Sequence, residues 1–130
     1  MFHSRQKGIG LIAAIFLIVV VASLAVGVAS LVRSGASAYV QDVLGYKAFL
    51  AADSGAQLSL NRVFAPQGTS SCGNRVYTFD MPGLEGCRAD VTCSAITVSG
   101  ELRYDLESHG HCTTGSEDAE RRIAVRAGAP

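Results

Sequence analysis

The stretch RQKGIGLIAAIFLIVVVASLAVGVASLV, residues 5–32, decides the fold because it changes abruptly from basic to apolar. Arg5 and Lys7 are followed by a run from Gly8 to Val32 that contains no charged residue. That run holds about 25 residues, and a helix of about 20 apolar residues crosses the hydrocarbon core of a bilayer. The sequence therefore predicts a transmembrane helix over residues 9–32.

The helix is expected to continue past the membrane as an amphipathic segment over residues 33–65. No proline occurs between Arg33 and Phe64. Apolar or small residues recur there at the three- and four-residue spacing of one helix face, at Leu44, Ala48, Ala51, Gly55 and Leu58. The small side chains of this stripe suit close packing of the helix on a sheet.

The 130 residues allow one domain outside the membrane, and we place a small β domain at residues 66–130. The chain has no tryptophan, so the core of this domain is small. Small exported domains often need covalent cross-links to be stable, and an even number of cysteines predicts two disulfides in an oxidising compartment. All four cysteines follow the apolar run: Cys72, Cys87, Cys93 and Cys112.

The charge distribution orients the chain. Two of the eleven Lys and Arg residues precede the apolar run, so nine remain after it against all eleven Asp and Glu. Basic residues beside a membrane segment stay in the cytoplasm, so the amino terminus is expected inside the cell and the cysteine-bearing domain outside the cytoplasm. The sequence has no strongly basic segment of the kind that would indicate nucleic-acid binding.

Alternation of apolar and polar residues predicts strands at 74–79, 87–97, 102–108 or beyond, and 121–126. Turn signals occur at residues 81–84 (MPGL) and at Ser99-Gly100, which is a plausible two-residue hairpin turn. The charged cluster at 117–122 is expected to be a solvated loop that enters the last strand. The predicted fold class is α+β, with a long N-terminal helix packed on a small antiparallel sheet.

These turns permit a register argument for the disulfides. A hairpin at Ser99-Gly100 places Cys87 opposite Cys112, and a turn near Pro82-Gly83 places Cys72 close to Cys93. The rival pairing joins neighbours in sequence, Cys72 to Cys87 and Cys93 to Cys112. A longer loop or a bulge would allow the rival, so both pairings stay open at this point.

Candidate chemistry is sparse. The sequence HGHC at residues 109–112 could take part in a zinc site, but its spacing matches no common zinc module. Nucleophile motifs, phosphate-binding glycine loops and metalloprotease helices do not occur in the sequence. We therefore expect no enzyme, no cofactor and no metal.

The first segment has three interpretations from its residues alone. It could be a secretory signal cleaved before Ser30, where Gly27-Val28-Ala29 forms a small-x-small site, although its apolar region is longer than the usual one of about 7–15 residues. It could be a plain, uncleaved anchor. The third interpretation is a short basic leader that ends at Gly8 and precedes an apolar segment that is kept.

The third interpretation resembles the type IV pilins. The residues that carry the resemblance are Arg5-Gln6-Lys7-Gly8 before Ile9-Gly10-Leu11-Ile12, and the small-residue stretch at 51–57 (AADSGAQ), which is similar to minor pilins of the PilX type. The segments at 91–94 (VTCS) and 104–112 (YDLESHGHC) are similar to biogenesis subunits of the mannose-sensitive haemagglutinin pilus, known as the MSHA pilus.

The resemblance implies a leader at residues 1–8 and a pilin-like fold. A prepilin peptidase would cut after Gly8 and N-methylate Ile9, and the chain would sit in the inner membrane with its C-terminal domain in the periplasm. Most pilins carry Glu at the fifth mature position, which here is Ala13.

The missing carboxylate points to an accessory subunit that acts in pilus assembly, in priming or at the tip. Its implied partners are other pilin subunits and the assembly machinery. The alternative from another class is a single-pass, membrane-anchored periplasmic binding module unrelated to pili.

Overall fold

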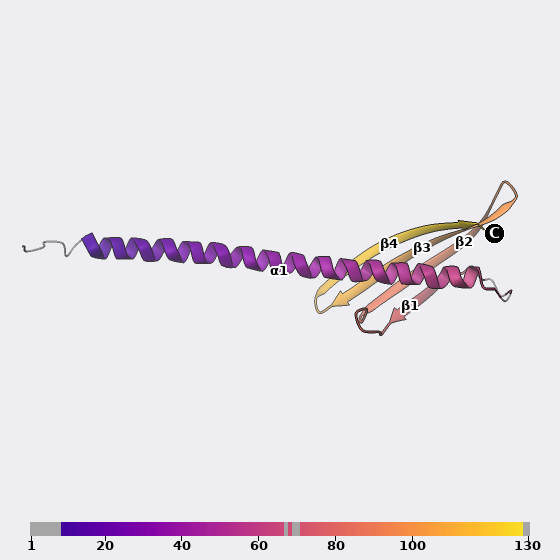
Figure 1. The fold of residues 1–130 in the computed structure, drawn as a ribbon, viewed down its shortest axis with the longest axis horizontal. Coiled ribbons are helices and arrows are strands. Elements are labelled where there is room, and N and C mark those ends of the chain that lie inside the picture. Colours follow the sequence, from indigo (N-terminus) through magenta and orange to yellow (C-terminus); the bar gives the residue numbers. More distant parts are fainter. Residues whose placement is uncertain (1–8, 67, 69–70, 129–130) are drawn as a thin grey trace, which may run out of the picture. The chain divides into compact units, whose positions relative to one another are not determined.

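The computed structural model describes residues 9–66, 68 and 71–128. Its elements are α1 (Ile9–Val63), β1 (Arg75–Phe79), β2 (Cys87–Val98), β3 (Glu101–Thr114) and β4 (Glu117–Gly128) (Figure 1). The chain divides into two units, Met1–Tyr39 and Val40–Pro130, with the boundary inside α1. The expected leader at 1–8, including Gly8, lies outside the described residues.

The described part of the first unit is helical from Ile9 to Tyr39. Its large apolar side chains from Leu11 to Val32 are exposed, with exposed fractions between 40% and 74%. Within the described residues, α1 is the one helix that is long and apolar enough to cross a membrane, by length and composition. An apolar helix surface of this kind requires an apolar environment, which supports a membrane anchor.

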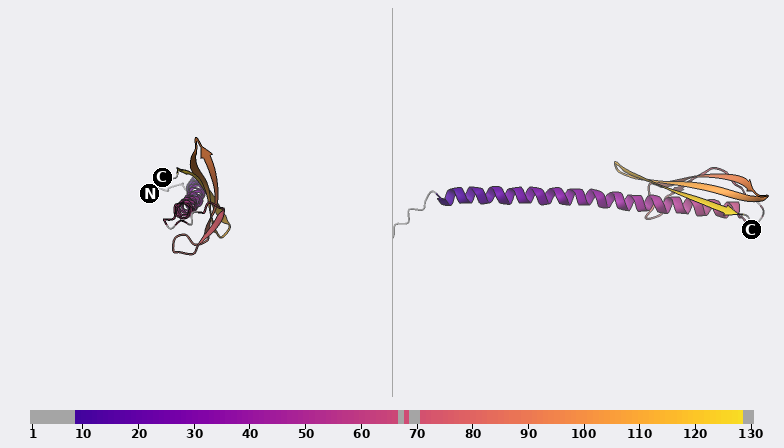
Figure 2. Two further views of the ribbon diagram at one scale, coloured as in Figure 1. Left: turned by 90° about the vertical axis from the view of Figure 1, so that its right-hand side faces the viewer. Right: turned by 90° about the horizontal axis from the view of Figure 1, so that it is seen from above.

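The second unit combines the part of α1 after Tyr39 with a four-stranded sheet in the order β1-β2-β3-β4. All neighbouring strands are antiparallel. The helix packs on one face of the sheet (Figure 2), where the Ser59 hydroxyl lies 3.1 Å from the Tyr77 hydroxyl and the Phe64 ring meets the Tyr104 ring edge-on at 5.7 Å. The predicted α+β layout is therefore confirmed.

Very small residues form the helix–sheet contact. A β-carbon built on Gly55 of α1 would lie 2.5 Å from the Ala89 β-carbon and 3.0 Å from the Ser108 hydroxyl oxygen. On β3, the helix backbone at Ala48 and Ala52 occupies the space that a β-carbon on Gly110 would need. The helix and sheet backbones therefore approach one another more closely than ordinary side chains permit.

The predicted helix stripe is correct except at its end. Leu44, Ala48 and Ala51 are buried, whereas Leu58 is 43% exposed. The buried face includes Gly55 of the predicted stripe and then continues through Ser59 and Val63 in place of Leu58. Ala52 and Ala56 are buried beside it.

Turn geometry sets the strand ends. Ser99 and Gly100 both have positive φ, 54° and 85°, as a type I′ hairpin turn requires. A second tight turn at Gly115, with φ of 62°, joins Thr114 to Glu117. The expected loop at the start of the charged cluster is therefore wrong, because residues 117–120 already pair with β3 as the first part of β4.

Two disulfides join Cys72 to Cys93 and Cys87 to Cys112, the pairs that the register argument favours. Cys87 and Cys112 are direct partners across β2 and β3, with Cα atoms 4.1 Å apart. Cys72 precedes β1 and lies beside Cys93, with 5.3 Å between their Cα atoms. The first bond ties the segment before β1 to β2, and the second lies in the core.

Candidate functional site

The exposed apolar helix of the first unit is one candidate interaction surface. Its serine at position 23 satisfies its own hydroxyl by donating to the Val19 carbonyl oxygen at 2.7 Å, as serine does in membrane helices. Ala13, the fifth residue counted from Ile9, lies on this helix and is exposed. The surface can therefore contact lipid or other apolar helices without leaving a side-chain hydroxyl unsatisfied at Ser23.

The sheet face turned away from α1 is the second candidate surface, and cross-strand charges cover it. Arg126 of β4 donates to both carboxylate oxygens of Asp105 on β3, at 2.5 and 3.1 Å. This bidentate contact lowers the pKa of Asp105 below its ordinary value and raises the pKa of Arg126. Bidentate pairs of this kind fix geometry as well as charge, so this pair holds β3 and β4 in register.

His109 occupies the middle of the same face, between two carboxylates. Its Nδ1 lies 3.0 Å from Glu120 of β4 and its Nε2 lies 3.3 Å from Glu107 of its own strand. The hydrogen bond from His109 lowers the pKa of Glu120. Arg122 reaches the same Glu107 carboxylate at 3.0 Å. These contacts form one ion-pair network that crosses from β3 to β4.

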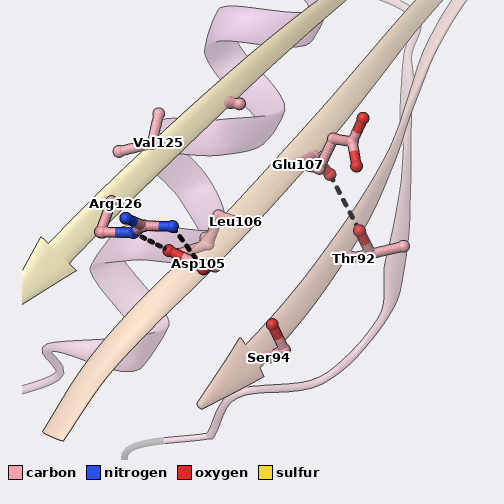
Figure 3. A pocket seen from close by; sticks show the side chains of 8 residues that line it. Thr92, Ser94, Asp105, Leu106, Glu107, Val125 and Arg126 are labelled. Atoms are coloured by element: carbon pink, nitrogen blue, oxygen red, sulfur yellow. Dashed lines mark hydrogen bonds and ion pairs between the residues drawn. The ribbon is translucent and has the colours of Figure 1, made fainter. Parts of the chain in front are cut away.

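An open depression of about 340 Å³ lies on this face beside the Asp105–Arg126 pair (Figure 3). The Thr92 hydroxyl donates to the Glu107 carbonyl oxygen at 3.4 Å on one side of it. The groups around it are hydroxyls, carboxylates and a guanidinium, carried by Thr92, Ser94, Asp105, Glu107 and Arg126. Such groups can exchange hydrogen bonds with a polar partner.

The residues of the HGHC sequence are divided between the two faces of the sheet. His109 and His111 lie on the outer face, with His111 4.0 Å from Asp118, whereas Cys112 is fully buried in its disulfide. In the described residues, no three His, Cys, Asp or Glu side chains gather in a way that could hold a metal ion. The three side chains therefore do not converge on one site.

The polar network was missed in the sequence because it depends on the β3–β4 register. The sequence does carry a signal for this register, because Gly115-Ser116 forms a two-residue hairpin turn between the paired residues Thr114 and Glu117. Once that turn is recognised, Asp105 falls opposite Arg126, and Glu107 falls beside Arg122. Opposite charges facing each other on adjacent strands are a recognised stabilising pattern.

A scan against protein-family models, a search of curated proteins and a search of solved structures each found no match to this chain.

Proposed function

We propose that this chain is a minor pilin-like subunit of type IV pilus biogenesis, of the kind represented by the MshP protein of the MSHA pilus. The observation that carries the proposal is the architecture of α1. Its first part is an exposed apolar helix, and its second part packs through small residues on a disulfide-bonded antiparallel sheet. Together with the basic leader that ends at Gly8, this order of parts is typical of a pilin.

In the proposed mechanism, the apolar helix holds the subunit in the inner membrane with its amino terminus in the cytoplasm. A prepilin peptidase removes residues 1–8 and methylates Ile9. The assembly machinery then extracts the helix, and burial among other pilin helices replaces burial in lipid. The free-energy change of this transfer is small per residue because both environments are apolar. Whether the helix stays in the lipid or joins the fibre therefore depends on how closely it packs against other pilin helices.

The absence of a carboxylate at Ala13 supports an accessory role. A glutamate inside a bilayer costs free energy unless it is paired, and the resemblance to pilins implies that this glutamate pairs with the amino terminus of a neighbouring subunit. A subunit with alanine there joins without that pair. We therefore propose a place in assembly, priming or the tip for this subunit, with other pilins as its partners.

Mass spectrometry of the amino-terminal peptide, on protein from cells that contain a prepilin peptidase, tests the proposal. We expect an N-methylated Ile9 as the first residue. The Gly8→Val variant is expected to keep its leader, and Gly10→Val serves as the matched control that is still cut. An intact leader in the unmodified protein, or a terminus at Ser30, would contradict the pilin proposal.

A membrane-anchored periplasmic binding module is the second candidate, and the open depression beside Asp105 and Arg126 is the observation that favours it. This candidate keeps its full amino terminus, so the same mass measurement distinguishes the two. It also predicts that Thr92→Ala and Ser94→Ala reduce binding to a polar ligand, whereas the pilin proposal predicts no effect of these changes on processing.

A further inference from the structure

The sheet has two open edges, β1 and β4. In the described part of the chain, neither strand pairs with anything on its outer side. Because every neighbouring pair is antiparallel, β1 and β4 of one copy run in opposite directions. Two copies that point the same way, as anchors in one membrane do, can therefore place β4 of one copy antiparallel beside β1 of the next.

The backbone groups at these edges are complementary. The Thr113 N–H of β3 donates to the Gly86 carbonyl oxygen at 3.1 Å, so odd-numbered residues of β3 direct their backbone groups toward β2. The Cys93 N–H of β2 donates to the Asn74 side chain, so odd-numbered residues of β2 direct theirs toward β1. Alternation along antiparallel strands then turns the N–H and C=O groups of the even-numbered residues outward in both β1 and β4. Thr78 of one copy and Ala124 of a second copy can thus exchange a pair of hydrogen bonds.

Charge favours this register over one of its two neighbouring registers. With Thr78 opposite Ala124, Asp80 at the end of β1 faces Arg122 of the second copy. Asp80 is exposed. The Arg122 side chain contacts Glu107 of its own copy at 3.0 Å and still has an exposed fraction of 63%, so it can also meet a second carboxylate. A slip of two residues in one direction would place Asp80 opposite Glu120, where like charges repel.

The same register matches the apolar side chains on the helix-facing side of the sheet. Phe79 then faces Ile123 of the second copy, and Tyr77 faces Val125. A groove of about 520 Å³ lies beside β1, lined by Phe79, Met81 and a polar and apolar stretch of α1 that includes Leu58. Ile123 of the second copy would enter this groove and cover the exposed Leu58 and Met81 side chains, which are 43% and 57% exposed.

We propose that copies of this chain associate edge to edge, with β4 of one copy extending the sheet of the next at β1. The partner is a second copy in the same orientation, and the contact is heterologous, so it leaves one open edge at each end of the row. This inference rests on the membrane anchor of the proposed function. One strand pair buries little area and is weak in solution, but anchoring in one membrane raises the effective concentration of the partner.

Zero-length carbodiimide cross-linking of the full chain in phosphatidylcholine vesicles tests the contact. The Arg122→Lys variant supplies an amine, and mixing ¹⁴N and ¹⁵N copies distinguishes bonds between copies from bonds within one. We expect a peptide that joins Asp80 of one isotope to the amine introduced at position 122 of the other. The matched control, Thr114→Lys, places an amine at an exposed strand end outside the proposed register and is expected to give no link to Asp80 of the other isotope.

Charge reversal gives a second readout, the recovery of one tagged copy with a differently tagged one. Asp80→Arg alone and Arg122→Asp alone are each expected to weaken recovery about tenfold, because a favourable cross-strand pair becomes a repulsive one. Mixing the two variants should restore recovery between unlike copies only, as a contact between position 80 of one copy and position 122 of another requires.

Two results would overturn the proposal: no peptide in vesicles that links Asp80 to position 122 of the Arg122→Lys variant, or recovery of the single reversals equal to that of the unmodified chain. Circular dichroism of each variant establishes that it is folded. The mass of the amino-terminal peptide from the same preparations reports the pilin proposal separately, so failure of either one leaves the other intact.

Discussion

Gly110 of β3 lies so close to Ala48 of α1 that a β-carbon on the glycine would overlap the Ala48 carbonyl oxygen. The same β-carbon would lie 2.5 Å from the backbone nitrogen of Ala52. Backbone atoms inside a helix cannot move aside as the end of a flexible side chain can. The contact therefore sets the distance between the helix and the sheet for the whole second unit.

Gly110→Ala is expected to destabilise the fold by about 3 kcal/mol, at the upper end of the range for overpacked cores. Urea unfolding of the full chain in detergent, followed by the circular dichroism of the sheet, measures the change. Gly73→Ala is the control, because its β-carbon would meet no atom within 4 Å, and it should change the free energy of unfolding by less than about 0.5 kcal/mol. Equal effects of the two changes on the free energy of unfolding would contradict the close contact between Gly110 and the helix backbone.

The two disulfides are expected to differ in their contribution to stability. They span similar sequence separations, 21 and 25 residues, so the loop-closure model gives each about 3 kcal/mol. Cys87 and Cys112 are also buried, and replacing both with alanine leaves a gap in the core. We therefore expect the Cys87→Ala, Cys112→Ala double variant to lose more stability than the Cys72→Ala, Cys93→Ala variant.

Thermal unfolding of the two double variants measures this difference. Peptide mapping without reduction checks the pairing itself, and a peptide that joins Cys72 to Cys87 would contradict the structure.

The Asp105–Arg126 pair predicts a pH dependence. Arg126 lowers the pKa of Asp105, so the stability that the pair adds is fully present above the ordinary Asp value of 3.8 and is lost as the pH falls through the lower folded value. Arg126→Ala should return the pKa of Asp105 toward 3.8, as measured by NMR titration of its carboxyl carbon. Arg122→Ala, on the same strand, should leave the Asp105 titration unchanged. An unchanged titration in Arg126→Ala would mean that the pair does not form in solution.

The Ser99-Gly100 turn predicts a stabilising substitution. Ser99 has a φ of 54°, a conformation that asparagine adopts more readily than serine, and Asn-Gly is the preferred pair for a type I′ turn. Ser99→Asn is expected to raise the free energy of unfolding by about 0.5 kcal/mol, and Ser99→Val to lower it, since β-branched residues disfavour positive φ. Chemical unfolding of both variants beside the unmodified chain measures the order. A more stable valine variant would contradict the turn assignment.

The sequence predicted the parts of the fold that depend on local patterns. The apolar run, the helical spacing through Ala48 and Ala51, and the Ser99-Gly100 turn each express a period or a turn chemistry that neighbouring residues determine. The β2–β3 register followed from that turn, and with it the juxtaposition of Cys87 and Cys112.

Features that depend on distant contacts were not predictable in the same way. The outer-face network needs the β3–β4 register, which begins at Gly115, and that turn was not recognised. The exposure of Leu58 depends on where the sheet ends beside the helix, because β1 is short and leaves the groove along Phe79 and Met81 uncovered. Helical periodicity alone could not distinguish Leu58 from the buried Ser59.

The two disulfides also determine how the second unit would respond to tension between its helix and its C-terminal strand. Force that enters through α1 crosses from Cys72 to Cys93, runs back along β2 to Cys87, and crosses to Cys112. β1 and the β2–β3 hairpin tip both lie inside closed covalent rings that carry no load. Beyond the helix, tension can extend three segments: the linker before Cys72, the short segment between Cys87 and Cys93, and the chain after Cys112. The disulfides therefore limit the extension of the domain to the length of these three segments.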